Sequence, residues 1–178
     1  MRLNLLERPK VRVTGYAAHL LEPERAMVIY TDREVLVARN HPEYPKWYVT
    51  PYGRFFHLTE RGLHEAKVKF PPSCAVGRPN MHSAYPYICP LKGNRYDCHR
   101  FIWEAYKGRR RKGMEIDHIN GNKFDWRLSN LEEVSPAENR KRAQILREMR
   151  RCGNEPCNLT SAELKRIFDS IRVKEIEN

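Results

Sequence analysis

The stretch Glu115-Ile116-Asp117-His118-Ile119-Asn120-Gly121-Asn122 decides how this sequence is interpreted, together with Asn130 and Asn139 further along the chain. Asp117 and Asn139 offer hard oxygen atoms, which are the ligands that Mg²⁺ prefers. His118 can take up a proton near neutral pH, because an imidazole titrates close to that range. Arginine and lysine are frequent around these residues, as in proteins that handle a phosphate backbone. The pattern predicts a site where a divalent cation and a histidine base act on phosphate.

The segments around this stretch predict the order strand, loop, strand, helix. One short strand is expected over Met114 to Asp117, and a second over Asn130 to Val134 after a loop rich in glycine and asparagine. Ser135-Pro136-Ala137-Glu138 then predicts a helix start, since serine can cap, proline suits the first helical position and the glutamate completes a capping box. This helix is expected to run to about Arg151.

Two further helices are predicted, one on each side of this unit. Apolar residues recur at helical spacing after His99 and predict a short helix that ends at Gly108, namely Phe101, Ile102, Ala105 and Tyr106. The capping box Thr160-Ser161-Ala162-Glu163 begins the other helix, whose apolar stripe consists of Leu164, Ile167, Phe168 and Ile171. That stripe needs a surface to cover, which is the core, a partner or a neighbouring helix.

The N-terminal half is rich in patterns that predict strands. Residues 26–39 hold two apolar runs around Thr31-Asp32-Arg33-Glu34, which predict a hairpin. The chain is expected to break at residues 41–45, and Pro51-Tyr52-Gly53 is a turn between two further apolar segments. Tyr85 to Leu91 is expected to form a strand at a sheet edge, because it contains two prolines.

The composition favours a polyanionic partner. The 33 Lys and Arg against 22 Asp and Glu give a formal net charge of +11 in 178 residues, with a pI near 9.6. A balance this basic makes nucleic acid the first candidate, although charge alone also fits a protein that is merely soluble. No run of 18 or more apolar residues occurs, so no segment is expected to span a membrane.

Two features favour a reduced, cytoplasmic protein. Met1 to Pro9 holds too short an apolar stretch for a signal peptide. The cysteines are odd in number and contain no C-x-x-C pair, which argues against a disulfide framework and a zinc knuckle: Cys74, Cys89, Cys98, Cys152 and Cys157.

Residues 98–143 closely resemble HNH endonucleases of the phage homing type. Several motif blocks carry this resemblance, in order and with suitable gaps: Cys98-His99-Arg100-Phe101-Ile102-Trp103-Glu104-Ala105-Tyr106, Asp117-His118-Ile119-Asn120-Gly121-Asn122-Lys123, Arg127-Leu128-Ser129-Asn130-Leu131 and Ser135-Pro136-Ala137-Glu138-Asn139. Upstream, Tyr48 to Phe55 looks like the short module that often precedes this nuclease core.

The resemblance implies an α+β fold in three parts. We expect a small, β-rich, DNA-contacting module over residues 1–92, a ββα-metal (HNH) nuclease core over residues 93–151 and a C-terminal helical segment over residues 152–178.

The resemblance also implies roles for matching residues. His118 would be the general base that deprotonates the attacking water, while Asp117 and Asn139 would hold one divalent cation. Asn130 would tie the two strands together and fix the backbone around His118. Mg²⁺ or Mn²⁺ is expected rather than a tight Zn²⁺ site, because Asn139 stands where other family members have a final histidine. His99 matches a histidine common in the family, and we expect it to serve packing or to link strands.

Two basic runs are expected to contact the phosphates of double-stranded DNA. One precedes the first strand of the core and the other follows Asn139: Arg109, Arg110, Arg111 and Lys112, then Arg140, Lys141 and Arg142. Such contacts position a duplex without reading its sequence. Sequence preference would come from groove contacts elsewhere, with residues 160–171 and four N-terminal cations as candidates: Arg54, Arg61, Lys67 and Lys69.

These inferences lead to a main hypothesis and two alternatives. The main hypothesis is a site-preferring, metal-dependent DNA endonuclease, acting as a monomer that nicks one strand or as a homodimer that cuts both. The first alternative is a nonspecific or structure-selective HNH nuclease in phage DNA processing or host defence. The second is a non-catalytic DNA-binding module. In each case we expect the cytoplasm of a bacterium or of a phage's bacterial host, and no membrane.

Overall fold

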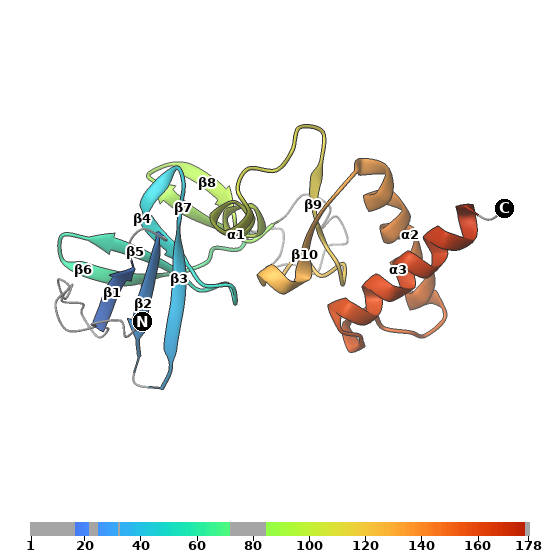
Figure 1. Ribbon diagram of the computed structural model, residues 1–178, viewed down its shortest axis with the longest axis horizontal. Coiled ribbons are helices and arrows are strands. Elements are labelled where there is room, and N and C mark those ends of the chain that lie inside the picture. The colour runs from blue at the N-terminus through green and yellow to red at the C-terminus, as the bar shows by residue number, and fades with distance from the viewer. Residues whose placement is uncertain (1–16, 22–24, 32, 72–84, 177–178) are drawn as a thin grey trace, which may run out of the picture.

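The computed structural model describes residues 17–21, 25–31, 33–71 and 85–176. Within them, a six-stranded sheet lies at one end of an elongated molecule, and helices α2 and α3 lie at the other (Figure 1). Two small two-stranded sheets and helix α1 lie between these ends. The described residues thus form a β-rich N-terminal part and three α-helices, so the predicted α+β class is confirmed.

The six-stranded sheet is an antiparallel meander in which each strand pairs with the next in the chain. Its strands are β1 (Ala17–Leu21), β2 (Ala26–Tyr30), β3 (Val35–His41), β4 (Tyr44–Val49), β5 (Phe55–Thr59) and β6 (Gly62–Ala66). The hairpin predicted over residues 26–39 is therefore confirmed as β2 and β3. Its turn is closed by Thr31, whose hydroxyl oxygen accepts a hydrogen bond from the Glu34 backbone N–H at 2.9 Å.

Strand β4 begins earlier than the predicted break at residues 41–45 allows. Only Pro42 and Glu43 form the turn, and β4 starts at Tyr44 and includes Pro45. The register between β3 and β4 shifts after Asn40, so Pro45 falls in an irregular part of the ladder. The missing N–H of proline is tolerated there because no regular ladder bond depends on it.

The two faces of the sheet join different cores because successive residues of a strand point to opposite sides. On β5, Phe56 joins a core with Met27 and Ile29 of the sheet itself. Its neighbour Phe55 joins a second core with Phe101 of α1. The sheet is therefore attached to the following part of the chain through apolar packing.

Helix α1 (Cys98–Lys107) follows a hairpin of β7 (Tyr87–Leu91) and β8 (Asn94–Asp97). The strand predicted from Tyr85 begins two residues later, and the helix ends at Gly108 as predicted. Phe101 and Ile102 of α1 are fully buried between the six-stranded sheet and Leu131. This second core therefore combines residues of the predicted N-terminal module, residues 1–92, with residues of the predicted nuclease core, residues 93–151.

Polar contacts reinforce that attachment. The Tyr106 hydroxyl donates to the Val49 carbonyl oxygen at 2.9 Å, and the Trp126 indole N–H donates to the Gly53 carbonyl oxygen at 3.1 Å. A Cβ at Gly53, whose φ is +91°, would lie 2.4 Å from the Trp126 ring. The turn at residues 51–53 therefore requires glycine, both for its backbone conformation and for this close approach.

The central unit contains the predicted order of strand, loop, strand and helix. Strand β9 (Glu115–His118) pairs antiparallel with β10 (Leu131–Val134), which follows the 3-10 turn η3 (Leu128–Asn130). Each strand begins one residue later than predicted. Helix α2 (Pro136–Arg151) begins as predicted, with the Ser135 hydroxyl oxygen accepting from the Glu138 backbone N–H at 3.2 Å. The Glu138 carboxylate accepts from Arg142.

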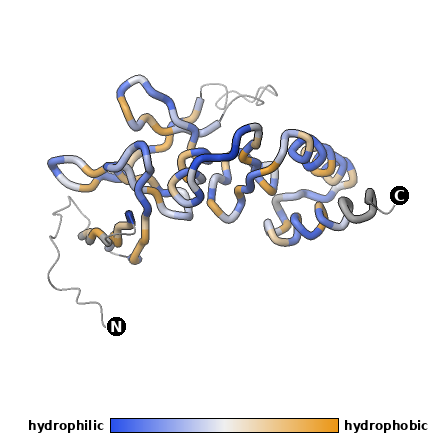
Figure 2. The backbone as a smooth tube through the Cα atoms, turned by 45° about the horizontal axis from the view of Figure 1, so that its top comes forward, coloured by the Kyte–Doolittle hydropathy of each residue, from blue (hydrophilic) through white to orange (hydrophobic). Residues whose placement is uncertain are grey.

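After the 3-10 turn η4 (Pro156–Asn158), helix α3 (Ser161–Ile176) packs against α2. Its capping box is reciprocal, because Thr160 and Glu163 each accept from the other's backbone N–H, at 3.2 and 2.7 Å. Figure 2 shows hydrophilic and hydrophobic residues mixed along α2 and along the coloured part of α3, as in amphipathic helices. Of the predicted apolar stripe of α3, Leu164 and Phe168 pack against Leu146 of α2 and Ile119 of the loop after β9.

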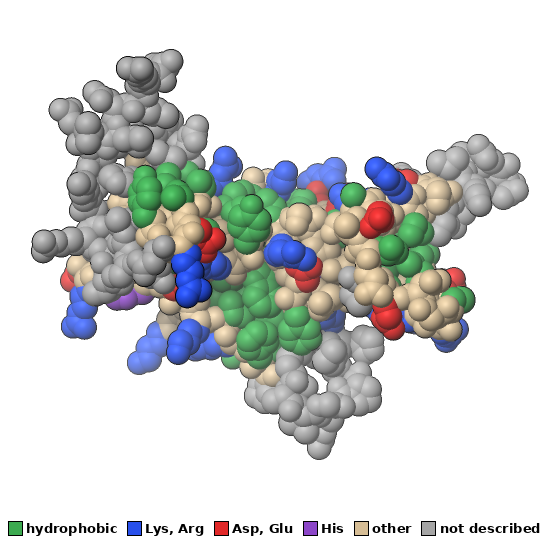
Figure 3. Space-filling view, turned by 90° about the horizontal axis from the view of Figure 1, so that it is seen from below, with side chains coloured by type: hydrophobic (Ala, Val, Ile, Leu, Met, Phe, Trp, Pro, Cys, Tyr) green, Lys and Arg blue, Asp and Glu red, His purple; other side chains and the backbone are tan. Residues whose placement is uncertain are grey.

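Hydrophobic and charged side chains are unevenly distributed over the surface. Figure 3 shows one face, on which hydrophobic side chains form several patches with Lys and Arg side chains between and around them. Among the described helices, none is long and apolar enough to cross a membrane. Cys89, Cys98 and Cys152 are free thiols, whereas Cys74 and the Met1 to Pro9 segment lie outside the described residues.

Candidate active site

Asp117 lies near the end of β9 with one carboxylate oxygen buried. Its Oδ2 has no hydrogen-bond partner among the described residues, and the nearest cation is Nη1 of Arg142 at 3.8 Å. Burial raises the pKa of Asp117 to about 7, although the positive charge of Arg142 opposes the rise. A buried, unpartnered carboxylate oxygen of this kind is suited to a cation, which would restore its ionised form.

Asn139 in the first turn of α2 faces the same strand. Its Nδ2 donates to Oε2 of Glu115 at 2.7 Å, and Glu115 shares a face of β9 with Asp117 because they are two residues apart. The amide oxygen of Asn139 is not used in that bond. The predicted pair, Asp117 and Asn139, therefore belongs to one interface between β9 and α2.

The donor set of this interface fits a hard divalent cation. Asp117 and Asn139 both offer oxygen, whereas the described residues hold no cluster of three or more His, Cys, Asp or Glu side chains that could bind a metal. A cation held by this pair would take most of its other ligands from water or phosphate, as Mg²⁺ usually does.

His118 ends β9 and is only 4% exposed. It points to the opposite side of the strand from Asp117, where its ring centre lies 5.0 Å from that of His99 and 5.9 Å from that of Tyr85. Its Nε2 is buried without a hydrogen-bond partner among the described residues. Burial lowers the pKa of His118 to about 4, so the imidazole is neutral at pH 7 and can accept a proton.

His99 and Tyr85 complete a cluster of three rings with His118. The ring centres of His99 and Tyr85 are 4.5 Å apart, and burial lowers the pKa of His99 to about 2. Tyr85 was not anticipated as part of the site. It precedes Pro86 in a segment 33 residues before His118, and nothing in its local sequence indicates that the two rings meet.

Asn130 is 1% exposed and fixes the loop that follows His118. Its Nδ2 donates to Asn120 Oδ1 at 2.9 Å and to the Asp125 carbonyl oxygen at 2.8 Å. Its Oδ1 accepts from the Asn120 backbone N–H at 3.1 Å and from the Ser161 hydroxyl at 3.3 Å. Its carbonyl oxygen accepts from the Ile119 N–H at 2.9 Å. The backbone on the C-terminal side of His118 is therefore held by one asparagine.

Gly121 allows the same loop to approach α2. Its φ of +68° lies in the left-handed region, and a Cβ at this position would lie 2.8 Å from Cδ1 of Leu146. Asn122 continues the turn, since its backbone N–H donates to Asn120 Oδ1 at 2.9 Å. The Asn-Gly-Asn sequence is thus a structural requirement of the loop.

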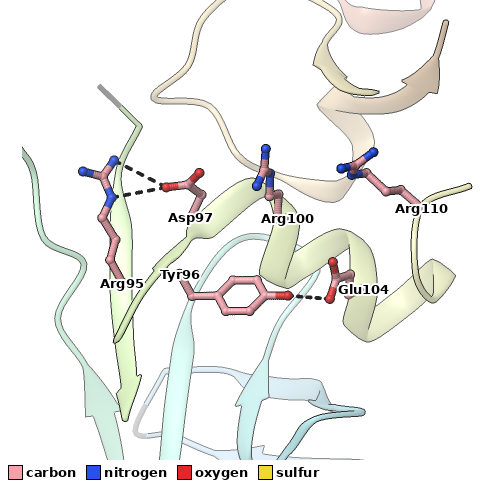
Figure 4. A pocket seen from close by; sticks show the side chains of 6 residues that line it. All are labelled: Arg95, Tyr96, Asp97, Arg100, Glu104 and Arg110. Atoms are coloured by element: carbon pink, nitrogen blue, oxygen red, sulfur yellow. Dashed lines mark hydrogen bonds and ion pairs between the residues drawn. The ribbon is translucent and has the colours of Figure 1, made fainter. Parts of the chain in front are cut away.

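A hollow of about 380 Å³ lies between the ring cluster and the β9–α2 interface, with Tyr85, His99, Glu115 and Asn139 in its lining. Arg100 and Arg110 line this hollow and also a neighbouring one. Figure 4 shows both guanidinium groups extending to the same side of the neighbouring hollow, above the hydrogen bond between Tyr96 and Glu104. Positive charge therefore borders the space next to the candidate site.

The basic loop, which we define as residues 109–112, makes several contacts within the protein. Arg109 forms an ion pair with Glu43, and Arg110 Nη1 donates to the Met114 carbonyl oxygen at 2.6 Å. Arg111 Nε lies 2.6 Å from Oε2 of Glu133. Lys112 is exposed. In the N-terminal sheet, Arg54 likewise pairs with Glu34 at 2.6 Å and with Glu65 at 2.8 Å.

The α2 groove has a different character. It is a hollow of about 660 Å³ between α2 and the loop after β9, and no Asp or Glu is among its lining residues. Five of those residues are cationic: Lys123, Arg140, Lys141, Arg147 and Arg150. Arg140 and Lys141 were predicted to contact DNA, and both are exposed here. Lys123 also lies over the Tyr85 ring, with its Nζ 4.5 Å from the ring centre.

Arg142 differs from the prediction that it contacts DNA. It is 7% exposed, and its guanidinium lies 2.7 Å from Glu132 and 3.1 Å from Glu138. The prediction treated residues 140–142 as one exposed run. Consecutive residues of a helix point in different directions, however, and Arg142 faces inward, towards the ring of Phe168. A structural role replaces the predicted phosphate contact.

Comparison with known proteins gives a match in this part of the chain. Residues 96–141 match the sequence profile of the HNH endonucleases, which confirms the predicted resemblance to that family over this segment.

A curated relative is the "SPbeta prophage-derived putative HNH homing endonuclease YosQ" of Bacillus subtilis (strain 168). It is 34% identical over 83 residues, which are 46% of this chain and 48% of the relative. The chain thus spans about half the length of that relative. No solved structure matches the chain.

Proposed function

We propose that the protein is a metal-dependent endonuclease of the homing type that hydrolyses phosphodiester bonds in double-stranded DNA. The observation that carries the proposal is the buried, unpartnered Oδ2 of Asp117 on β9, the strand that Asn139 of α2 contacts through Glu115, with a neutral His118 beside it in a segment that matches the HNH family. Strands β9 and β10 with helix α2 would be the ββα-metal core. The prophage origin in the relative's name supports a phage or bacterial setting.

His118, Asp117, Asn139 and Asn130 have distinct roles in this proposal. His118 accepts the proton of the attacking water, because its imidazole is neutral at pH 7. Asp117 and Asn139 hold Mg²⁺ or Mn²⁺, which when bound would neutralise a phosphate oxygen and stabilise the departing 3′-oxygen. Asn130 keeps the backbone after His118 in place through its bonds to Asn120 and Asp125.

The distribution of positive charge supports DNA as the substrate. The α2 groove presents cations without acids in its lining, beside the loop that follows His118. We assign the phosphate backbone of the duplex to this groove, with the basic loop as a second contact. In the proposed organisation, residues 1–92 contribute further DNA contacts, residues 93–151 contain the nuclease core and residues 152–178 form a helical segment. The active form is a monomer or a homodimer.

The test is cleavage of supercoiled plasmid and phage genomic DNA in Mg²⁺, Mn²⁺ or EDTA. The wild-type protein should produce open circles or discrete fragments only with metal, and His118→Ala should lose that activity by at least about 100-fold, as expected for removal of a general base. His64→Ala is the matched control, because His64 is an exposed histidine on β6. Undiminished cutting by folded His118→Ala would contradict the mechanism.

The same digests separate the alternatives. Uniform degradation of unrelated duplexes would replace the homing type by a nonspecific HNH nuclease. Salt-sensitive binding without products in any metal would favour a non-catalytic DNA-binding module.

A further inference from the structure

Helix α3 lies beyond the segment that matches the HNH family, which ends at residue 141, yet it reaches the candidate active site. Its Leu164 and Phe168 are buried with Leu146 of α2 and with Ile119, the residue that follows His118. Figure 1 shows α3 beside α2, at the opposite end of the molecule from the six-stranded sheet. The packing of α3 therefore touches the backbone next to the predicted base.

Phe168 of α3 helps to hold the guanidinium of Arg142. The Cζ of Arg142 lies 4.9 Å from the ring centre of Phe168, while Glu132 and Glu138 bind its nitrogens at 2.7 and 3.1 Å. The distance from Arg142 Nη1 to Asp117 Oδ2 is 3.8 Å, too long for a hydrogen bond. Arg142 thus offsets the charge of Asp117 without occupying its buried oxygen.

Two more contacts join α3 to the site. The Ser161 hydroxyl donates to Oδ1 of Asn130 at 3.3 Å, and Lys165 Nζ lies 3.0 Å from Oε1 of Glu132. Glu132 is the register partner of Asp117 across the β9–β10 pair. The helix is therefore linked to β10 and to both ends of the loop between the strands.

We infer that α3 is a positioning element of the nuclease centre, in which Phe168 keeps the Arg142 guanidinium off Asp117 Oδ2 so that this oxygen stays open to a divalent cation. The inference rests on the proposed function, because it takes Asp117 as a cation ligand. Without the aromatic ring, the guanidinium can close the 3.8 Å gap to Asp117 and compete with the cation. A cation–π contact of ordinary strength corresponds to a change of roughly three- to tenfold in such a competition.

The test measures binding of Mn²⁺ alone to the full chain, by electron paramagnetic resonance of the unbound ion. Phe168→Leu keeps an apolar side chain but removes the ring face, and should raise the Mn²⁺ dissociation constant about three- to tenfold. Phe168→Trp supplies a new ring face and should restore most of the binding. Met149→Ala is the control, since Met149 of α2 packs against the same core and its truncation should lower Tm while leaving the Mn²⁺ constant unchanged.

Asp117→Ala separates failure of this inference from failure of the proposed function. If Asp117→Ala binds Mn²⁺ as the wild type does, the ligand assignment itself is wrong and the inference is overturned with it. If Asp117→Ala loses Mn²⁺ but Phe168→Leu keeps the wild-type constant, only the role of α3 is overturned.

A second pair of variants avoids any cavity in the core. Ser161→Ala removes the donor to Asn130, and should lower kcat for plasmid cleavage about two- to fivefold with KM unchanged, as the loss of one hydrogen bond predicts. Ser170→Ala is matched to it, because the Ser170 hydroxyl donates to the Ile167 carbonyl oxygen on the same helix. Equal kcat values for the two variants would overturn a positioning role for Ser161.

Discussion

The basic loop and the α2 groove are both dense in positive charge, but the protein uses that charge differently. In the loop, Arg109 and Arg111 are paired with Glu43 and Glu133. The α2 groove contains five cationic residues and no acid in its lining. An arginine that already has a carboxylate partner gives up that partner when it binds phosphate, so its net contribution to DNA binding is smaller. We therefore expect the α2 groove to contribute more to DNA binding than the basic loop.

The largest expected effect contrasts the two faces of α2. Arg142→Met removes a buried arginine from its half-buried partners Glu132 and Glu138 and should lower the free energy of unfolding by about 3 kcal/mol. Arg140→Met on the exposed face should change it by less than about 0.5 kcal/mol. Urea unfolding followed by circular dichroism measures both. Similar values for the two variants would show that Arg142 is not the structural residue that its burial indicates.

The next effect tests the α2 groove itself. Replacing Arg140, Arg147 and Arg150 with Gln should weaken binding to a labelled duplex about 100-fold near ~0.1 M salt, since charged hydrogen bonds to phosphate are lost. The slope of log K against log salt should fall by about 2.7, which is roughly 0.9 for each phosphate contact. Fluorescence anisotropy across a salt series gives both quantities. An unchanged slope would show that the α2 groove does not bind the DNA backbone.

The matched triple variant in the basic loop should have a smaller effect. Replacing Arg109, Arg110 and Arg111 with Gln should weaken the same duplex less than about fivefold, because two of the three side chains already have carboxylate partners. The same anisotropy titration measures it. A greater loss of affinity than in the groove variant would show that the basic loop, and not the α2 groove, is the main contact with DNA.

The smallest effect concerns Glu104 on α1, the helix that precedes the basic loop. Its carboxylate accepts hydrogen bonds from His41 at 3.2 Å and Tyr96 at 2.5 Å. Burial raises the pKa of Glu104, but these bonds outweigh it, so the net pKa is lowered below 4.5. A lowered folded-state pKa adds stability above pH 4.5, which is lost as the pH falls through the folded value. The stability advantage of the wild type over Glu104→Gln should therefore shrink between pH 7 and pH 3.5 in urea unfolding. An advantage independent of pH would exclude this linkage.

Local signals predicted much of the fold because their causes are local. The end of α1 at Gly108 and the start of α2 after Ser135 depend on residues within one helical turn. The β2–β3 hairpin likewise follows from a short turn between two apolar runs. Strand limits were less accurate, as at Pro45, because a strand's extent depends on the register of its partner.

The sequence by itself determined the resemblance to HNH endonucleases, the order of strand, loop, strand and helix, and the candidate residues Asp117, His118, Asn130 and Asn139. Those residues lie in motifs that can be recognised from their spacing in the sequence alone. Only the tertiary structure decided which arginines are exposed, that Tyr85 lies beside His118, and that α3 contacts the site. The physical reason is that burial and charge pairing depend on neighbours far away in the chain, as when Arg109 meets Glu43 across 66 positions.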